Sequence, residues 1–267
     1  RWALELVTTT SLEEKLAPGA PPSAREPTRT SRDPSPGRPP ELRVQARQSR
    51  KPKGTSSLAD PRARARLLHA FFHHELQAAE LFAWAVLRFP DVPDALARGW
   101  ARLACEEIGH ARLYRDRLDG LGFAIGAFPV RDWFWQRVRP VESPARFLAL
   151  VGLGLEGGNL EHARDFAQRF AAANDDESAR LQRRIANDEI AHVRFARRWL
   201  TELTGDESFA GWAALLPPPT SPGLYRGDTL DREARKSAGL DDAFLDALEA
   251  SPRPRGHLPA RHDGHAR

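Results

Sequence analysis

The chain has 267 residues, of which 41% are hydrophobic and 28% are charged, and it contains 22 prolines. This length fits one domain of roughly 200 residues with extensions, and the proline content predicts that part of the chain stays outside the core. A single cysteine excludes a disulfide framework and a four-thiolate zinc site. No apolar run reaches the roughly 18 residues that span a bilayer, so we expect no membrane segment and a cytoplasmic location.

The positive charge is concentrated in one segment. Residues 25–66 carry 12 basic and four acidic side chains, a net charge of +8, whereas residues 67–267 sum to −3. A basic arm of this kind can contact phosphates, which makes nucleic acid one candidate partner. Only four of the 40 basic residues are lysine, and this arginine bias is also typical of a GC-rich genome.

The first 57 residues are predicted to form an extension. Short helical turns are expected over residues 1–16, where Ser11 and Glu14 have the spacing of a capping box. Nine prolines between residues 17 and 56 then predict an extended linker without helix or sheet. We therefore place the domain boundary between residues 57 and 58.

Four long helices are predicted over residues 58–205. Asp60 followed by Pro61 is a typical helix start, and Gly205 is a typical helix end. The expected helices cover residues 60–89, 93–118, 143–173 and, after a turn at 174–177, the stretch up to residue 203. The long crossover over residues 120–142 is expected to be irregular, although it contains the aromatic cluster 133–135.

Residues 206–267 are predicted to form a C-terminal extension. Three prolines at 217–219 interrupt it, and a short helix is expected over 241–250. No segment of the domain alternates between apolar and polar residues with period two. The predicted fold class is therefore all-α: a four-helix bundle with a short turn, a long crossover and a second short turn.

Two of the predicted helices contain the motif Glu-x-x-His, as Glu107–His110 and Glu189–His192. Residues three apart share a helix face, so each carboxylate and imidazole can reach one metal ion. Both motifs lie on the apolar face of their helix, where an unpaired charge is costly. This position favours a buried metal site over a solvated surface.

Each motif also follows an earlier glutamate at a matching distance. Glu75 precedes the first motif by 32 residues and Glu156 precedes the second by 33. In a bundle, one glutamate from each of two helices and Glu-x-x-His from each of the other two form a di-metal carboxylate site. The predicted ligands are Glu75, Glu107, His110, Glu156, Glu189 and His192.

The two halves of the domain resemble each other in sequence. Residues 104–112 align with residues 186–194 at an offset of 82. A duplicated helix pair explains this similarity and gives the site pseudo-twofold symmetry. The alternative is a metal-free polar network, in which four buried carboxylates would repel one another without cations.

Four acids beside the predicted ligands have two interpretations each. Glu106 and Asp188 precede a ligand glutamate, and each either accepts a hydrogen bond from the second nitrogen of a ligand histidine or faces solvent. Glu80 and Glu161 align at an offset of 81. They are candidate catalytic acids or substitute ligands, or else partly exposed helix charges.

Tyr114 is a third candidate catalytic residue, because it lies one turn beyond His110 on the inward face. It is either a redox-active or hydrogen-bonding phenol beside the metals or a core aromatic. Glycines at 152, 154, 157 and 158 surround Glu156, and they indicate either close helix packing or a local bulge beside the metals. The histidines at 73, 74 and 162 lie off the inward face, and those at 257, 262 and 265 lie in a polar tail.

The ligand pattern resembles that of the ferritin-like superfamily of di-iron carboxylate proteins. The whole chain is similar to an uncharacterised bacterial family of ferritin-like proteins without an assigned function. The segments that carry this similarity are 11–18, 36–43, 73–81 and 228–235. The resemblance implies a ferritin-like bundle that holds two iron ions, or one manganese and one iron.

Three functions follow from this resemblance. The first is an oxidoreductase that uses O2 or peroxide on a small-molecule substrate and takes electrons from a reductase partner. The second is a ferroxidase or other metal-handling protein. The third is an RNA-modifying hydroxylase, for which the basic residues 25–66 would supply phosphate contacts.

Overall fold

The computed structural model describes residues 1–23, 30–45, 58–218 and 220–253. Within these ranges the chain is helical and contains no strand. The described β contacts amount to one isolated parallel bridge between Val44 and Val130. The prediction of an all-α chain is confirmed for this part of the protein.

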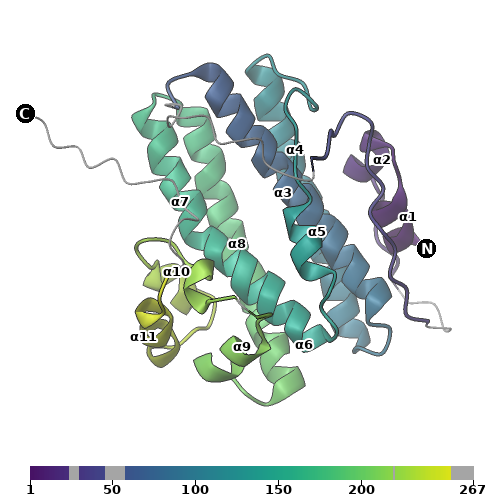
Figure 1. Cartoon of the computed structure of the whole chain (residues 1–267), viewed down its shortest axis with the longest axis vertical. Coiled ribbons are helices and arrows are strands. Elements are labelled where there is room, and N and C mark those ends of the chain that lie inside the picture. Colours follow the sequence, from purple (N-terminus) through teal and green to yellow (C-terminus); the bar gives the residue numbers. More distant parts are fainter. Residues whose placement is uncertain (24–29, 46–57, 219, 254–267) are drawn as a thin grey trace, which may run out of the picture.

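Four long helical segments form the centre of the molecule (Figure 1). They are α3 (Pro61–Arg88), α4 (Asp94–Gly120), the continuous run of α6 (Pro144–Phe147), η1 (Leu148–Glu156) and α7 (Gly157–Ala172), and α8 (Asp176–Thr204). The α3 and α4 helices pack along each other, as do α7 and α8. The contact between α4 and α8 joins these two helix pairs.

The ends of the long helices follow from local sequence. The Asp60 side chain accepts a hydrogen bond from the backbone N–H of Arg62 at 3.0 Å, and Pro61 occupies the first helical position. At the other end of the domain, Gly205 adopts the left-handed conformation that closes α8, with φ of 69°. The observed bounds therefore agree closely with the predicted ones.

The third long segment departs from the single α-helix expected over residues 143–173. Its nine residues Leu148–Glu156 form a π-helix, in which each turn is wider than in an α-helix. A Cβ added at Gly152 would lie 2.2 Å from the Cβ of Ala196 on α8. Close packing and altered helix geometry thus occur together in this glycine-rich stretch, immediately before the Glu156 side chain.

The crossover between α4 and α6 is not wholly irregular, contrary to our expectation. It contains the short helix α5 (Trp133–Val138). The side chain of Gln77 on α3 accepts a hydrogen bond from the backbone N–H of Phe134 at 3.2 Å, which satisfies one free donor at the start of α5. This partner is distant in sequence, so local patterning did not reveal the helix.

The terminal extensions cover opposite sides of the four long segments (Figure 1). On one side, α1 (Trp2–Thr8) packs on α3 and α2 (Leu12–Leu16) packs on α4. On the other side lie α9 (Phe209–Leu215), η2 (Pro222–Tyr225), α10 (Arg232–Ser237) and α11 (Asp242–Ala250). Residues 30–45 contain neither helix nor strand, as predicted, and the rest of the linker at 24–29 and 46–57 lies outside the described residues.

None of the described helices is long and apolar enough to cross a membrane.

Two apolar clusters fill the interior. One contains the buried side chains of Trp84, Trp100 and Phe147, and the other contains those of Phe72 and Phe170. Along α4, the first cluster extends to residue 108 and the second begins at residue 111. The predicted ligands of α4 therefore lie at the boundary between the two apolar clusters, where water cannot easily solvate a charge.

Candidate metal centre

The structure brings the six predicted ligands together in the interior. They come from all four long segments: Glu75 from α3, Glu107 and His110 from α4, Glu156 from the end of η1, and Glu189 and His192 from α8. All six side chains are buried. They form two groups, and within each group the potential ligand atoms all lie within 4.8 Å of one another.

The two groups share two members. The first contains Glu75, Glu107, His110 and Glu189, and the second contains Glu107, Glu156, Glu189 and His192. Each group thus has one histidine and one glutamate of its own, while Glu107 and Glu189 belong to both. This arrangement can hold two cations, with the shared carboxylates between them.

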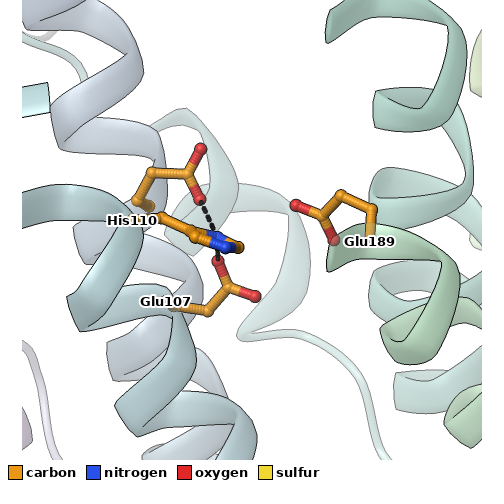
Figure 2. Close-up of side chains that lie close together, drawn as sticks. Glu107, His110 and Glu189 are labelled. Carbon is orange, nitrogen blue, oxygen red and sulfur yellow. Dashed lines mark hydrogen bonds and ion pairs between the residues drawn. The ribbon is translucent and has the colours of Figure 1, made fainter. Parts of the chain in front are cut away.

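Both histidines direct Nδ1 toward the carboxylates. His192 Nδ1 lies 2.8 Å from Glu107 Oε1 and 3.0 Å from Glu189 Oε2. His110 Nδ1 lies 3.3 Å from Glu107 Oε2 and 3.7 Å from Glu75 Oε2. Figure 2 shows Glu107 and His110 together on α4, with the Glu189 carboxylate facing them from α8.

The opposite ring nitrogen of each histidine contacts an acid on the other helix. His192 Nε2 lies 2.9 Å from Glu106 Oε2, and His110 Nε2 lies 3.3 Å from Asp188 Oδ2. The Glu106 side chain is 44% exposed and the Asp188 side chain is 45% exposed, so both acids connect a buried histidine with solvent. Such contacts fix the ring orientation and favour the tautomer whose Nδ1 can bind a metal.

Three buried atoms of the cluster make no hydrogen bond of acceptable geometry to any described residue. They are Glu107 Oε1, Glu189 Oε2 and His192 Nδ1, and they face one another at the short distances given above. A buried polar atom without a hydrogen bond is destabilising. A cation bound among these atoms would satisfy all three, and mixed carboxylate and imidazole donors suit iron or manganese.

Protonation partly offsets the repulsion when no metal is bound. Burial, together with the nearby charge of Glu107, raises the pKa of Glu75 well above its ordinary value. Burial, together with the charges of Glu189 and Glu107, does the same to the pKa of Glu156. Burial lowers the pKa of His110, but Glu107 and Glu75 outweigh it and raise that pKa to about 12. Metal binding must therefore displace protons.

Tyr114 lies beside the cluster in a hydrogen bond between two helices. Its hydroxyl accepts a hydrogen bond from Nε2 of Gln182 on α8 at 2.7 Å, and its ring packs on Phe71 with 5.6 Å between centroids. Burial, together with the charge of Glu75, raises the pKa of the phenol well above its ordinary value. The phenol is therefore neutral, and a redox role for it stays a prediction.

Glu80 lies outside the cluster and is fully buried among cations from the N-terminal extension. Its carboxylate lies 2.7 Å from Lys15 Nζ and 2.7 Å from Arg38 Nη1. It also accepts a hydrogen bond from Trp135 Nε1 at 2.7 Å. These contacts use both oxygens of Glu80, so the structure gives it the role of an anchor for α2 and the linker rather than that of a pocket acid.

Glu161 has the corresponding role for the C-terminal extension. Its two carboxylate oxygens accept hydrogen bonds from Nε and Nη2 of Arg235, both at 2.7 Å. The backbone N–H groups of Gly227 and Asp231 each donate to it at 3.1 Å. The structure therefore places this acid, too, outside the two groups of predicted ligands.

The remaining histidines are not part of the cluster. His73 Nε2 lies 2.9 Å from Asp132 Oδ1, and His74 stacks on Phe134 with 4.9 Å between ring centroids. His162 is partly buried, and its Nε2 has no hydrogen-bond partner among the described residues. The histidines at 257, 262 and 265 lie outside the described residues.

Sequence reasoning missed one residue in contact with a ligand. Asn159 Nδ2 donates a hydrogen bond to Glu189 Oε1 at 3.0 Å. Asn159 lies three residues after Glu156 and so shares its helix face, which is the signal that could have identified it. Its equivalent on α3 is Ala78, so the two halves differ at this position.

Comparisons with known proteins identify a family but no function. An uncharacterised protein from Haemophilus influenzae is 28% identical over 201 residues, which cover 71% of this chain and 69% of that protein. No solved structure matches the chain. Residues 3–246 match a family described as "Protein of unknown function (DUF455)". Since this match covers most of the sequence, the chain belongs to the DUF455 family.

Proposed function

We propose that the protein is a di-metal carboxylate oxidoreductase that uses two iron ions, or one manganese and one iron, with O2 or peroxide as oxidant. The observation that carries this proposal is the pair of buried donor groups that share Glu107 and Glu189. Two cations that share two carboxylates neutralise four acids at once. A site for one cation would leave the other group to be compensated by protons on its own ligands.

The same arrangement supports a ferritin-like four-helix bundle. Such bundles place one glutamate on each of two helices and Glu-x-x-His on each of the other two. Here α3 and η1 supply the single glutamates, while α4 and α8 supply the two motifs. The repeated spacing and the crossed contacts of Glu106 and Asp188 both favour an origin by duplication of a helix pair.

Each half would then hold one ion. His110 and Glu75 would bind the first, His192 and Glu156 would bind the second, and Glu107 and Glu189 would contact both. With six protein ligands for two ions, positions remain for oxidant or substrate. When bound, the reduced ions supply the electrons that O2 or peroxide accepts.

The surrounding residues control protons and water. Glu106 and Asp188 hold the histidines in the metal-binding tautomer, and they offer a route by which displaced protons reach solvent. The two apolar clusters exclude bulk water on both sides of the cluster. Asn159 orients one oxygen of Glu189 and leaves the other directed at His192.

Iron loading under anaerobic conditions tests the proposal. We expect about two ions per chain, the number the two donor groups can hold. Addition of O2 and a chemical reductant should then give continuous O2 consumption and a new visible absorption. A double substitution of Glu107→Gln and Glu189→Gln should abolish both signals. As a matched control, Glu177→Gln with Glu202→Gln removes two exposed acids from α8 and should change neither signal.

Other outcomes separate the alternatives. Uptake of hundreds of ions per assembly, with O2 consumed only in proportion to added iron, would favour the metal-handling function. Failure of the wild-type chain to bind iron or manganese would contradict the proposal. Binding that survives the double substitution would contradict the ligand assignment.

A further inference from the structure

The outward face of α8 carries a row of exposed side chains in which five of seven are basic and none is acidic. The exposed residues Arg180, Arg183, Arg184, Arg194 and Arg198 lie within about 100° of the helix circumference, at 100° per residue. Asn187 and Ala191 complete the row, which we call the α8 crest. Glu189 and His192 point the opposite way, into the metal centre.

No acid lies within the crest. Asp188 is at its edge, where it contacts His110, and the acids Asp176 and Glu202 lie beyond its two ends. Five positive charges therefore stand together, although residues 67–267 as a whole sum to −3.

Most of this charge is uncompensated. Neither Arg180 nor Arg183 pairs with an acid among the described residues, and Arg184 reaches Asp188 only at 3.9 Å. Arg194 donates to the backbone carbonyl of Ser237, which leaves its charge unpaired. The crest can therefore accept anions without first breaking strong ion pairs.

Both ends of the crest border shallow depressions. A depression of about 470 Å³ lies between α4 and α8, where Arg117 joins Arg180 and Arg184. A second, of about 350 Å³, lies where Arg197 joins Arg194 and Arg198 beside the turn at Gly239. Acids also line both depressions: Glu177 pairs with Arg117 in the first, and Glu207 pairs with Arg197 in the second. The uncompensated charge at each end is therefore that of the crest arginines themselves.

The size and chemistry of the crest restrict its partner. From residue 180 to residue 198 the helix rises about 27 Å, which exceeds the reach of a single phosphorylated metabolite. Arginine forks match phosphate oxygens in a bidentate geometry. Protein interfaces have an apolar centre and membrane-surface helices bury an apolar face, whereas the crest offers only Ala191 and the apolar face of α8 is packed inside.

We propose that the α8 crest binds the phosphodiester backbone of a nucleic acid, through phosphate contacts that do not depend on base sequence. This binding surface is separate from the basic residues 25–66 and does not rest on the redox function proposed above. Because the crest lies on the helix that supplies Glu189 and His192, a bound strand would pass over the metal centre.

Fluorescence anisotropy with the full-length protein tests this proposal. The probes are a labelled DNA duplex of about 20 base pairs and a labelled RNA strand of about 20 nucleotides, titrated between roughly 50 and 300 mM salt. We expect the triple variant Arg180→Gln, Arg183→Gln and Arg198→Gln to bind the preferred probe at least about tenfold more weakly at 100 mM salt. For this variant, the slope of the logarithm of the binding constant against the logarithm of the salt concentration should be smaller in magnitude by about two to three.

A control variant of equal charge distinguishes the crest from a general effect. Arg115→Gln, Arg164→Gln and Arg169→Gln also remove three partly exposed arginines, and they lie off the crest. This control should bind within about twofold of wild type. Equal binding by the two triple variants, or no binding of either probe by wild type at low salt, would overturn the proposal. The far-UV circular dichroism spectrum and the Tm of both variants should match those of the wild type, which verifies that they are folded.

Discussion

Six buried carboxylates lie on the four long segments, and they fall into two sets. The cluster acids are Glu75, Glu107, Glu156 and Glu189, and the clamp acids are Glu80 and Glu161. The protein itself supplies Lys15 and Arg38 to one clamp acid and Arg235 to the other. Among the described residues the cluster acids contact histidines, each other and, at Glu189, the amide of Asn159, but no lysine or arginine. The chain therefore pairs the clamp acids with lysine or arginine, and it pairs the cluster acids with histidines, which are also able to bind metal ions.

The sharpest test of this comparison uses two glutamates that are five residues apart. Glu161→Gln should lower the free energy of unfolding by about 3–5 kcal/mol, because it leaves Arg235 buried without its ion-pair partner. Glu156→Gln should change the stability of the metal-free protein by less than about 1 kcal/mol, since its raised pKa already keeps this carboxyl neutral. Chemical denaturation of metal-free protein measures both.

An exposed pair provides the control for that prediction. Glu249 contacts Arg232 at 3.2 Å and is 53% exposed, so Glu249→Gln should cost less than about 1 kcal/mol. A similar loss of stability for Glu156→Gln and Glu161→Gln would show that the two sets of acids are equivalent, contrary to our account.

Removal of metal should produce the next largest change in stability. This change should require intact cluster acids. At a free metal concentration 100 times the Kd, one bound ion stabilises the folded state by about 2.7 kcal/mol. Chelation should therefore lower the Tm of the wild type. It should leave the Tm of the Glu107→Gln and Glu189→Gln double variant unchanged. Differential scanning calorimetry with and without chelator gives the comparison.

The acids outside the cluster should affect metal affinity more weakly. Glu106→Gln and Asp188→Asn each remove the partner of one ligand histidine, and each should weaken metal binding about 10- to 100-fold. Because Glu106 on α4 contacts His192 on α8, Glu106→Gln should lower the affinity for the ion held by His192. Competition with a coloured chelator measures both affinities, and a selective loss at the site of His110 would contradict this assignment.

The stability of the metal-free protein and that of the metal-loaded protein should change with pH in opposite directions. Folded metal-free protein keeps protons on Glu75 and Glu156 that the unfolded chain releases above about pH 4.5. His110, with its pKa raised to about 12, adds stability below about pH 6.5 that is lost as the pH rises toward 12. Metal-free stability should thus fall between pH 5 and 8, by up to about 1.4 kcal/mol per pH unit for each proton.

Metal-loaded protein should behave in the opposite way, since bound cations require the ligands to be deprotonated. The difference in Tm between loaded and metal-free protein should therefore increase from pH 5 to pH 8. Thermal melts at several pH values test this, and a difference that is independent of pH would contradict buried protonated ligands.

The smallest expected effect concerns Tyr114. Tyr114→Phe removes the hydrogen bond from Gln182 and should cost about 1 kcal/mol of stability. Metal content should not change, because the phenol is absent from both donor groups. Loss of metal in this variant would show that the tyrosine takes part in the site.

Much of the fold and the cluster could be predicted because their signals are local or periodic. Asp60 and Gly205 marked helix ends through their own backbone and side-chain chemistry. The ligands were recognisable because residues three apart share a helix face and because the spacing is repeated. Such features require no knowledge of which distant segments meet.

The clamp acids could not be assigned in that way. Glu161 meets Arg235 across 74 residues. Glu80 meets Lys15 from the short helix α2 and Arg38 from a linker whose prolines give no periodic signal. The sequence pattern predicted both acids as pocket acids, substitute ligands or partly exposed helix charges, whereas both are buried in ion pairs with partners that the pattern could not identify. The same reason explains α5, whose first turn is capped by Gln77 from another helix.

The central claim is that the cluster acids hold two cations, and anomalous X-ray scattering from crystals of iron-loaded protein tests it most directly. Our account predicts two anomalous peaks about 3.5–4 Å apart, one beside His110 and Glu75 and the other beside His192 and Glu156, with Glu107 and Glu189 contacting both. A single peak, or peaks that lie away from these six side chains, would contradict it.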